Sequence, residues 1–259
     1  MHAPGGDRFV TELRGCTAEF ARIIGGDPER PVPACPGWTF RQLAAHRGRG
    51  HRRAAQIVAG RAAMPIPVRE VAGGKLPPDP APHALGLNAG AGRVTEAVTA
   101  AGSDRVRTLA GTGPASVRAR RRAREAAVRL ADAQLAAGRD VDLAPEAAAD
   151  GIDEWPGLTA ASTGGTPDPA RAQDPRGDGQ SLHFHAAGPG LSGTGQWLVT
   201  RTPSGVTVTR GHGKADVAVR GPAARLLLVL TRRLPPSAPA IEVPGEQALL
   251  THWLQHTPF

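Results

Sequence analysis

Residues 32–52, VPACPGWTFRQLAAHRGRGHR, decide the fold of the first half of the chain. They open with a turn rich in proline, after which Thr39 stands three positions before Gln42. In such a capping box the threonine side chain accepts from the backbone N–H of the glutamine, whose own side chain reaches back to the threonine N–H. The pattern predicts a helix that begins at Thr39 and runs past His46 to about Ala59.

Three other segments have the spacing of a helix. Apolar residues recur three and four positions apart over residues 7–24. Weaker helical patterns cover residues 85–101 and 116–137, and the last segment is rich in alanine, arginine and leucine. A loop with six prolines, residues 64–83, separates the second helix from the third. Four helices within about 140 residues predict a helical bundle.

Apolar and polar residues alternate in the last third of the chain. This period of two predicts four strands, at residues 181–185, 196–200, 206–210 and 215–220. Helices are expected at 223–233 and 246–255, with a short strand at 241–243. These elements predict a small α/β unit.

Residues 156–180 are rich in glycine, proline, aspartate and threonine, which predicts a mobile loop or linker. The expected fold class is therefore α+β. Three regions are expected: a helical bundle at residues 1–140, a connecting helix and loop at 141–180, and the α/β domain at 181–259.

Several protein classes are excluded by composition. The longest nearly apolar stretch, Leu226–Leu230, is too short to span a bilayer. No apolar segment follows Met1, so we expect no signal peptide. Two cysteines, Cys16 and Cys35, form neither a disulfide framework nor a cysteine-type zinc site. We expect a soluble cytoplasmic protein without a membrane partner.

The 259-residue chain is strongly basic, with a formal net charge of +8. All but Lys75 and Lys214 of its 31 basic residues are arginines. Neither interleaved aromatic residues nor a recognisable nucleic-acid motif accompanies them. We therefore expect no specific nucleic-acid partner, although loose, salt-sensitive association is compatible with the charge.

Two histidine patterns suggest metal chemistry. His46 and Glu125 lie on two different predicted helices, and an imidazole facing a carboxylate is how bundles build a metal site. By spacing alone, a core histidine and a surface glutamate explain the same pattern. His183 and His185 stand two apart on a predicted strand and so share one face. That pair can bind a metal or belong to an ordinary strand.

Three segments resemble the mycothiol-dependent maleylpyruvate isomerase family. The first is CPGWT at residues 35–39, followed by LAAH at 43–46 and GRGHR at 48–52. The second is AREAAVRLADA at 123–133, which is similar to a family signature of type A-H-E-T-A-V-H-R-W-D-A. The third is the run from 205 to 228, which contains HGKADVAVRGPA. The resemblance covers nearly the whole chain apart from the loop at 156–180.

The resemblance implies a DinB-like four-helix bundle followed by a small α/β domain similar to sterol-carrier folds. It also implies a divalent metal, usually zinc, held by three side chains whose positions fall on His46, Glu125 and Arg129. The metal activates the thiol of mycothiol for attack on a small electrophilic substrate. The implied function is thus a metal-assisted, mycothiol-dependent isomerase or thiol transferase.

The chain departs from this pattern at the third ligand position. Arginine has no acceptor and stays protonated, so Arg129 is not a ligand and can instead pair with Glu125. Asp132, seven residues after Glu125 on the same helical face, is a weaker substitute ligand. Arg49 and Arg52 are candidates for holding carboxylates of the thiol cofactor or the substrate.

Charged residues also occupy a face of the fourth helix that a bundle buries, at positions 118, 122, 125, 129 and 132. Unpaired buried charge is strongly destabilising. The pattern therefore predicts either a loosened, wet bundle or an anion held in the cleft. The alternative function is a non-catalytic scaffold of the same fold that binds a small anion or a partner protein.

Overall fold

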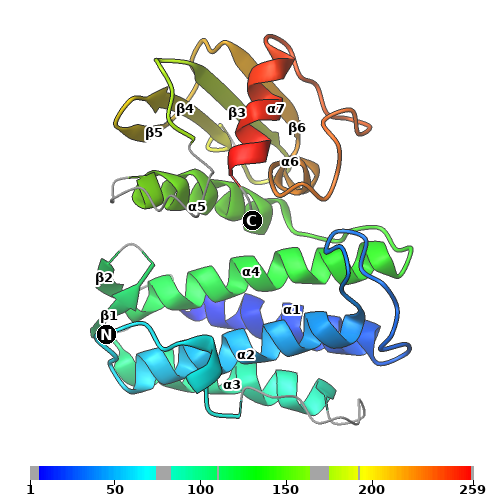
Figure 1. Ribbon diagram of the computed structural model, residues 1–259, viewed down its shortest axis with the longest axis vertical. Helices are drawn as coiled ribbons and strands as arrows, with labels where there is room; N and C mark the ends of the chain where they lie inside the picture. The colour runs from blue at the N-terminus through cyan, green and yellow to red at the C-terminus, as the bar shows by residue number, and fades with distance from the viewer. Residues whose placement is uncertain (1–5, 74–82, 110, 164–174, 192, 258–259) are drawn as a thin grey trace. The chain divides into compact units, whose positions relative to one another are not determined.

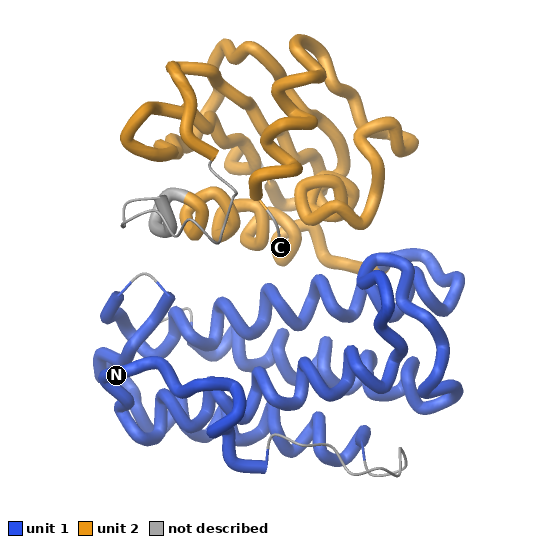
Figure 2. Tube along the Cα trace, viewed as in Figure 1, with its two compact units in different colours: residues 1–141 blue, residues 142–259 orange. Residues whose placement is uncertain are grey.

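The computed structural model describes residues 6–73, 83–109, 111–163, 175–191 and 193–257. The chain divides into two compact units, residues 1–141 and 142–259 (Figure 2). None of the helices in these described ranges is long and apolar enough to cross a membrane.

The first unit is built from the helices that periodicity predicts (Figure 1). They are α1 (Gly6–Ile24), α2 (Phe40–Ala59), α3 (His83–Ala101) and α4 (Ala115–Ala136). Between them lie a short 3-10 helix, η1 (Val68–Glu70), and an antiparallel hairpin of β1 (Arg105–Thr108) and β2 (Gly111–Pro114). The hairpin was not expected, because its strands have almost no apolar alternation. Much of the predicted proline-rich loop, residues 74–82, lies outside the described residues.

The four helices form a bundle in which α1 and α2 are diagonal to each other. Helix α1 packs mainly on α3 and α4, and α2 packs mainly on the same two helices. The connection between α1 and α2 therefore has to cross one end of the bundle, as residues 25–39 do (Figure 1).

The predicted capping box forms at the start of α2. The backbone N–H of Thr39 donates to Oε1 of Gln42 at 2.8 Å. The preceding turn closes through a hydrogen bond from the N–H of Val32 to the carbonyl of Trp38, at 2.9 Å, and Gly37 has the positive φ of 79° that this turn requires. The turn brings the Trp38 ring to 5.2 Å from the ring of His46.

The bundle core consists of two apolar clusters. One gathers residues such as Leu13, Val58 and Val94, and the other residues such as Phe20, Leu43 and Leu130. Where the two clusters meet, the bundle also contains a set of buried or half-buried polar side chains that we call the polar layer. Its members are Thr17, Arg47, His51, Arg122, Glu125, Arg129 and Asp132.

The second unit is a four-stranded sheet with three helices. The sheet order is β5-β4-β3-β6, with β3 parallel to β6 and the other neighbouring pairs antiparallel. The elements are α5 (Pro145–Thr163), β3 (Ser181–Ala187), β4 (Gln196–Thr202), β5 (Gly205–Arg210), β6 (Val217–Pro222), α6 (Ala223–Leu230) and α7 (Gln247–His256). All four predicted strands are present. The strand expected at 241–243 is reduced to an isolated bridge between Arg220 and Glu242.

The loop predicted to begin at residue 156 begins later. Helix α5 continues through Pro156 to Thr163, because Ile152 and Trp155 bury the same face and Thr159 follows them on it. Proline removes one backbone hydrogen bond and its ring crowds the carbonyl four residues earlier, a cost that the packing of this face offsets. Residues 175–180 are also tied down, since Arg201 donates to the carbonyls of Pro175 and Arg176. The rest of the predicted mobile segment, 164–174, lies outside the described residues.

Candidate functional site

The structure brings His46 and Glu125 together, as the sequence predicts. His46 lies on α2 and Glu125 on α4, and the distance from His46 Nε2 to Glu125 Oε1 is 3.4 Å. The imidazole is 39% exposed and the carboxylate 16% exposed, so the pair is reached from solvent on the histidine side. The Trp38 ring flanks the imidazole.

The carboxylate of Glu125 is also bound by a guanidinium from its own helix. Nη1 of Arg122 lies 2.5 Å from Glu125 Oε2. Burial by itself would raise the pKa of Glu125, but Arg122 and the hydrogen bond from His46 more than offset it and hold the pKa well below its usual range. Glu125 is therefore ionised at neutral pH.

The guanidinium of Arg122 spans from Glu125 on α4 to His51 on α2. Its Nη2 lies 3.2 Å from His51 Nδ1, and its side chain is only 8% exposed. The guanidinium rests against Gly50, where a Cβ atom would lie 2.8 Å from each of its two terminal nitrogens. We call this arrangement of Arg122, Glu125, His51 and Gly50 the guanidinium clamp.

His51 is fully buried and acts as an acceptor in the clamp. Burial first, then Arg122 and Arg47, hold its pKa well below 6.5, so the ring is neutral. Its Nδ1 faces a group that can only donate, which places the ring proton on Nε2, 3.4 Å from Thr17 Oγ1. The Thr17 hydroxyl in turn donates to the carbonyl of Leu13 at 2.6 Å.

Arg47 completes the polar layer between α1, α2 and α4. It is 1% exposed and donates to Thr17 Oγ1 at 3.0 Å and to the carbonyl of Ala126 at 3.2 Å. Its guanidinium lies 4.4 Å from the centre of the Phe20 ring. Burial lowers the pKa of Arg47 to about 9.

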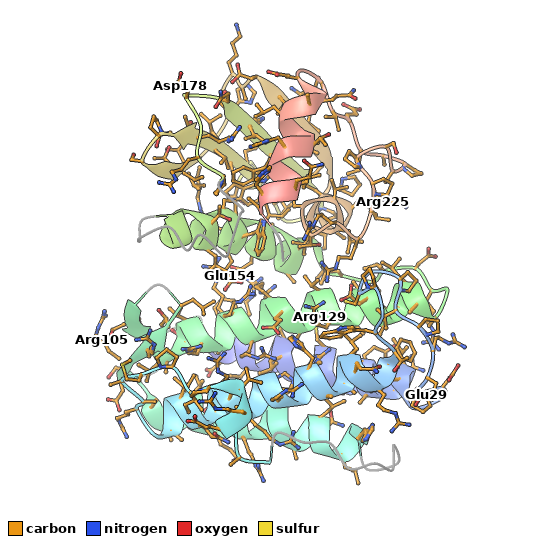
Figure 3. The ribbon with its side chains drawn as sticks, in the orientation of Figure 1. Glu29, Arg105, Arg129, Glu154, Asp178 and Arg225 are labelled. Atoms are coloured by element: carbon orange, nitrogen blue, oxygen red, sulfur yellow. The ribbon has the colours of Figure 1, made fainter. Side chains whose placement is uncertain are left out.

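Arg129, on α4 (Figure 3), turns to a different carboxylate from the one expected. Its Nη1 lies 2.9 Å from Asp132 Oδ2 and 3.3 Å from Cys35 Sγ. The guanidinium that pairs with Glu125 is instead that of Arg122. Both observed pairs join residues three apart on α4, although the four-residue spacing of Glu125 and Arg129 would also have allowed that pair.

The donors around His46 do not fit a catalytic divalent metal. Such a site needs three protein ligands and an open fourth position. The part of the chain that the structure describes holds no group of three or more His, Cys, Asp and Glu side chains that could bind one ion. Arg129 has no lone pair to offer, and Asp132 is bound by Arg129.

Each of the charged positions expected on the buried face of α4 has a hydrogen-bond partner, so these residues by themselves require neither a loosened bundle nor a bound anion. Arg122 and Arg129 each pair with a carboxylate, and Arg118 donates to the carbonyl of Arg107 at 2.5 Å. Burial and neighbouring arginines lower the pKa of Arg118 to about 10.

The two candidates for holding cofactor carboxylates lie on α2. Arg49 is half-buried, three positions after His46. Arg52 lies beside Gly73 and Gly86, and burial lowers its pKa. These positions put Arg52 on the side of α2 that meets α3, away from the partner that His46 finds on α4.

The second histidine pair lies on β3. His183 is buried, and its ring centre lies 6.1 Å from that of His185 and 5.2 Å from that of His212. Burial and the two neighbouring histidines lower the pKa of His183. These three residues, all within the described part of the chain, do not form a group that could hold a metal ion. They are explained as strand and turn residues.

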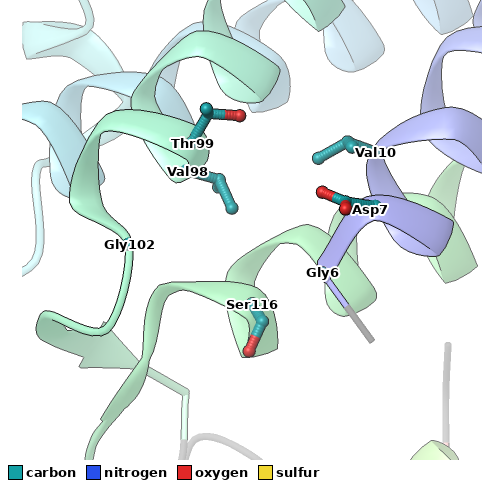
Figure 4. Close-up of a pocket in the computed structure, with 7 residues that line it drawn as sticks. All are labelled: Gly6, Asp7, Val10, Val98, Thr99, Gly102 and Ser116. Carbon is teal, nitrogen blue, oxygen red and sulfur yellow. The ribbon is translucent and has the colours of Figure 1, made fainter. Parts of the chain in front are cut away.

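A small pocket in the bundle lies elsewhere. Its volume is about 20 Å³, enough for about one water molecule, and its polar side chains are Asp7, Thr99 and Ser116 (Figure 4). It holds none of the predicted site residues.

Sequence reasoning missed two contacts of the site. The first is the bond between Arg122 and His51, because helical spacing places His51 away from His46 and says nothing about a second helix. The second is the approach of Arg129 to Cys35, whose sequence neighbours include no basic residue. The only available signal is the run of charges on the buried face of α4.

Comparison with known proteins identifies both halves of the chain. A family model described as "Mycothiol maleylpyruvate isomerase N-terminal domain" matches residues 10–134, and one described as "MDMPI C-terminal domain" matches residues 146–252. A search of curated proteins found no match.

Two solved structures are similar over nearly the whole chain. One is a mycothiol-dependent maleylpyruvate isomerase, with a TM-score of 0.53, 19% identity and 93% coverage of each chain. The other is a histidine-to-alanine mutant described by the same name, with a TM-score of 0.54, 18% identity and the same coverage. At these identities the likeness shows the fold, and it confirms the expected α+β class.

Proposed function

The chain belongs to the mycothiol maleylpyruvate isomerase family, and from this premise we propose that it is a mycothiol-dependent isomerase or thiol transferase for a small electrophilic substrate. The observation that carries the proposal is the pair of His46 and Glu125, half-exposed on the histidine side and 3.4 Å apart. An imidazole oriented by an ionised carboxylate is a general base suited to a thiol.

The pair can activate a thiol without a further group. Because Glu125 is ionised, it accepts from His46 Nε2–H and leaves Nδ1 as the acceptor. The S–H proton of mycothiol passes to Nδ1, and the thiolate adds to an electrophilic carbon of the substrate. In an isomerisation, the thiolate adds to one carbon of a conjugated C=C bond, whose π electrons move to the adjacent carbonyl as an enolate. The former double bond is now single and rotates, the enolate collapses to re-form C=C and expel the thiolate, and the proton returns from His46 to sulfur.

Positive charge around the pair favours this chemistry. Arg122 keeps Glu125 ionised, so the imidazolium that forms on His46 is stabilised by a carboxylate. Arg49, three positions after His46 on α2, is the residue we propose for a carboxylate of mycothiol or the substrate, whereas Arg52 lies on the side of α2 that meets α3 and is the weaker candidate. The proposed reaction uses no metal, because among the described residues no third His, Cys, Asp or Glu side chain joins His46 and Glu125 in a group that could hold an ion.

The test is an isomerisation assay on the full chain with maleylpyruvate, in the presence and absence of mycothiol. We expect turnover that requires mycothiol and falls at least about 100-fold in kcat/KM in His46→Ala, the typical loss for a general base. His185→Ala, a histidine of the second unit, is the matched control and should keep full activity. Activity unchanged in His46→Ala contradicts the proposed base. Mycothiol binding with no turnover across related electrophiles would favour the non-catalytic scaffold.

A further inference from the structure

We propose that the guanidinium of Arg122 is a built-in cation of this site and occupies the carboxylate of Glu125 that a divalent metal beside His46 would need. The inference rests on the proposed function only for the location of the site. It assigns to Arg122 the role of a positioning residue: a fixed cation that holds Glu125 in place for His46.

The first argument is the choice of partners. Nη1 of Arg122 binds a carboxylate oxygen of Glu125 at 2.5 Å, and Nη2 binds the imidazole Nδ1 of His51 at 3.2 Å. Carboxylate oxygen and imidazole nitrogen are the donor types that bind zinc in proteins. The lone pairs of Glu125 Oε2 and His51 Nδ1 both face the guanidinium of Arg122, which satisfies them as a bound metal ion would.

The second argument is packing. Gly50 leaves a hollow in α2, and a Cβ there would lie 2.8 Å from both terminal nitrogens of Arg122. With its side chain 8% exposed, Arg122 is enclosed in this hollow and not extended into solvent. The bundle is therefore packed around the guanidinium, and removing the Arg122 side chain would open a gap between α2 and α4.

The third argument is the charge of the polar layer. Among its described members, three guanidiniums (Arg47, Arg122 and Arg129) face two carboxylates (Glu125 and Asp132). The layer thus carries an excess positive charge before any metal enters. A divalent cation would add to this excess in a place where burial makes uncompensated charge costly.

Because Arg122 holds Glu125, a metal site cannot be restored at position 129 alone. A histidine at position 129 supplies the missing ligand but leaves Glu125 bound by Arg122. The single variant Arg129→His should therefore bind zinc no better than the wild-type chain. Removing Arg122 as well frees the carboxylate of Glu125, and the double variant should gain a site made of His46, Glu125 and the new histidine.

The experiment titrates Zn²⁺ into the untagged full chain after treatment with a chelator, and measures the metal retained per chain by mass spectrometry. The wild type and Arg129→His should retain no more than a trace. Arg122→Gln combined with Arg129→His should bind Zn²⁺ at least about tenfold more tightly, and His46→Ala added to it should abolish the gain. Arg120→Ala combined with Arg129→His is the matched control, since it also removes one arginine from α4 but keeps Arg122.

Three results would overturn the inference. One is stoichiometric zinc in the wild type that is lost in His46→Ala. Another is Arg129→His binding zinc as tightly as the double variant, and the third is a folded double variant that binds no more than the control. Folding of the double variant is checked by circular dichroism. If it does not fold, Zn²⁺ titration of the wild type and of Arg129→His still tests the inference, because tight zinc binding by either chain refutes the clamp.

The outcome is separable from that of the proposed function. The metal measurement uses neither mycothiol nor substrate. Zinc in the wild type would refute the built-in cation while mycothiol-dependent turnover stands. Absence of turnover would refute the enzyme while the clamp stands.

Discussion

Replacing both members of the Arg122–Glu125 pair should disturb the bundle less than replacing either one. The two side chains are 8% and 16% exposed and meet at 2.5 Å. Breaking a buried ion pair by removing one partner costs about 3–5 kcal/mol, because a charge is left uncompensated. Since Glu125 keeps some contact with solvent, the lower end applies, about 3 kcal/mol each for Arg122→Met and for Glu125→Leu.

The double variant leaves no such charge. Its cost reduces to the bond that His51 loses, about 1–2 kcal/mol. The two single losses sum to about 6 kcal/mol, so the coupling energy between the two positions should be about 4 kcal/mol. The matched control is the pair of Arg22 and Glu19 on α1, whose side chains are 61% and 36% exposed. An exposed pair of this kind should couple by no more than about 0.5 kcal/mol.

The assay must report on the bundle alone, because a chain with two units need not unfold in one step. Hydrogen exchange of α4 peptides under increasing urea, followed by mass spectrometry, gives the unfolding free energy of that unit. If the losses of the two single variants add in the double variant, Arg122 and Glu125 do not stabilise each other and the reasoning fails.

Three further predictions concern the same helices. Gly50→Ala should lower the unfolding free energy by about 1–3 kcal/mol, because its Cβ meets the clamped guanidinium. Gly92→Ala is the control, because a Cβ at this position meets no atom within 4 Å, and it should raise the unfolding free energy by about 0.5–1 kcal/mol. Equal effects of the two variants in urea unfolding would contradict the hollow at Gly50. The pKa of His51 is held well below 6.5 in the folded chain, so below pH 6.5 the unfolded chain binds a proton at this residue and the folded chain does not. The free energy of unfolding should therefore fall below pH 6.5, by up to about 1.4 kcal/mol per pH unit. Unfolding curves across pH should lose that slope in His51→Gln, and a slope that persists would assign it to another group. Burial raises the pKa of Cys16, so its thiol should react with iodoacetamide more slowly than that of Cys35, and faster labelling of Cys16 by mass spectrometry would contradict its burial.

Helix positions were predictable because they depend on neighbours in sequence. The start of α2 follows from the capping box at Thr39, and the four helices end within about two residues of the apolar periodicity that predicts them. The encounter of His46 with Glu125 followed from family resemblance, since spacing alone favoured an ordinary core histidine and a surface glutamate.

Partner choice within the site was not predictable, because it depends on how helices pack. Arg122 and His51 are 71 positions apart, and Arg129 and Cys35 are 94 apart. On α4 itself, Arg122 and Arg129 both have helical spacing that brings them near Glu125. Only the three-dimensional packing decides that Arg122 takes it.

The local composition of residues 156–163 gave a wrong prediction, and the reason is again tertiary packing. Residues 156–163 read as loop because proline and glycine disfavour helices by local preference. The burial of Ile152 and Trp155 against the second unit's other elements overrides that preference. A tertiary effect of this kind leaves no signal in a short window of sequence.

The polar layer also determines how the helices are aligned along one another. Half of the buried residues of α4 are alanines, and such small, uniform side chains discriminate poorly between neighbouring alignments. Sliding α4 along α2 by one turn, about 5.4 Å, would leave the alanine contacts nearly unchanged. It would, however, carry Glu125 and Arg122 into the apolar clusters and away from His46, His51 and Gly50. The buried charges thus select one register among several that packing alone would allow, as a single polar position does in a coiled coil.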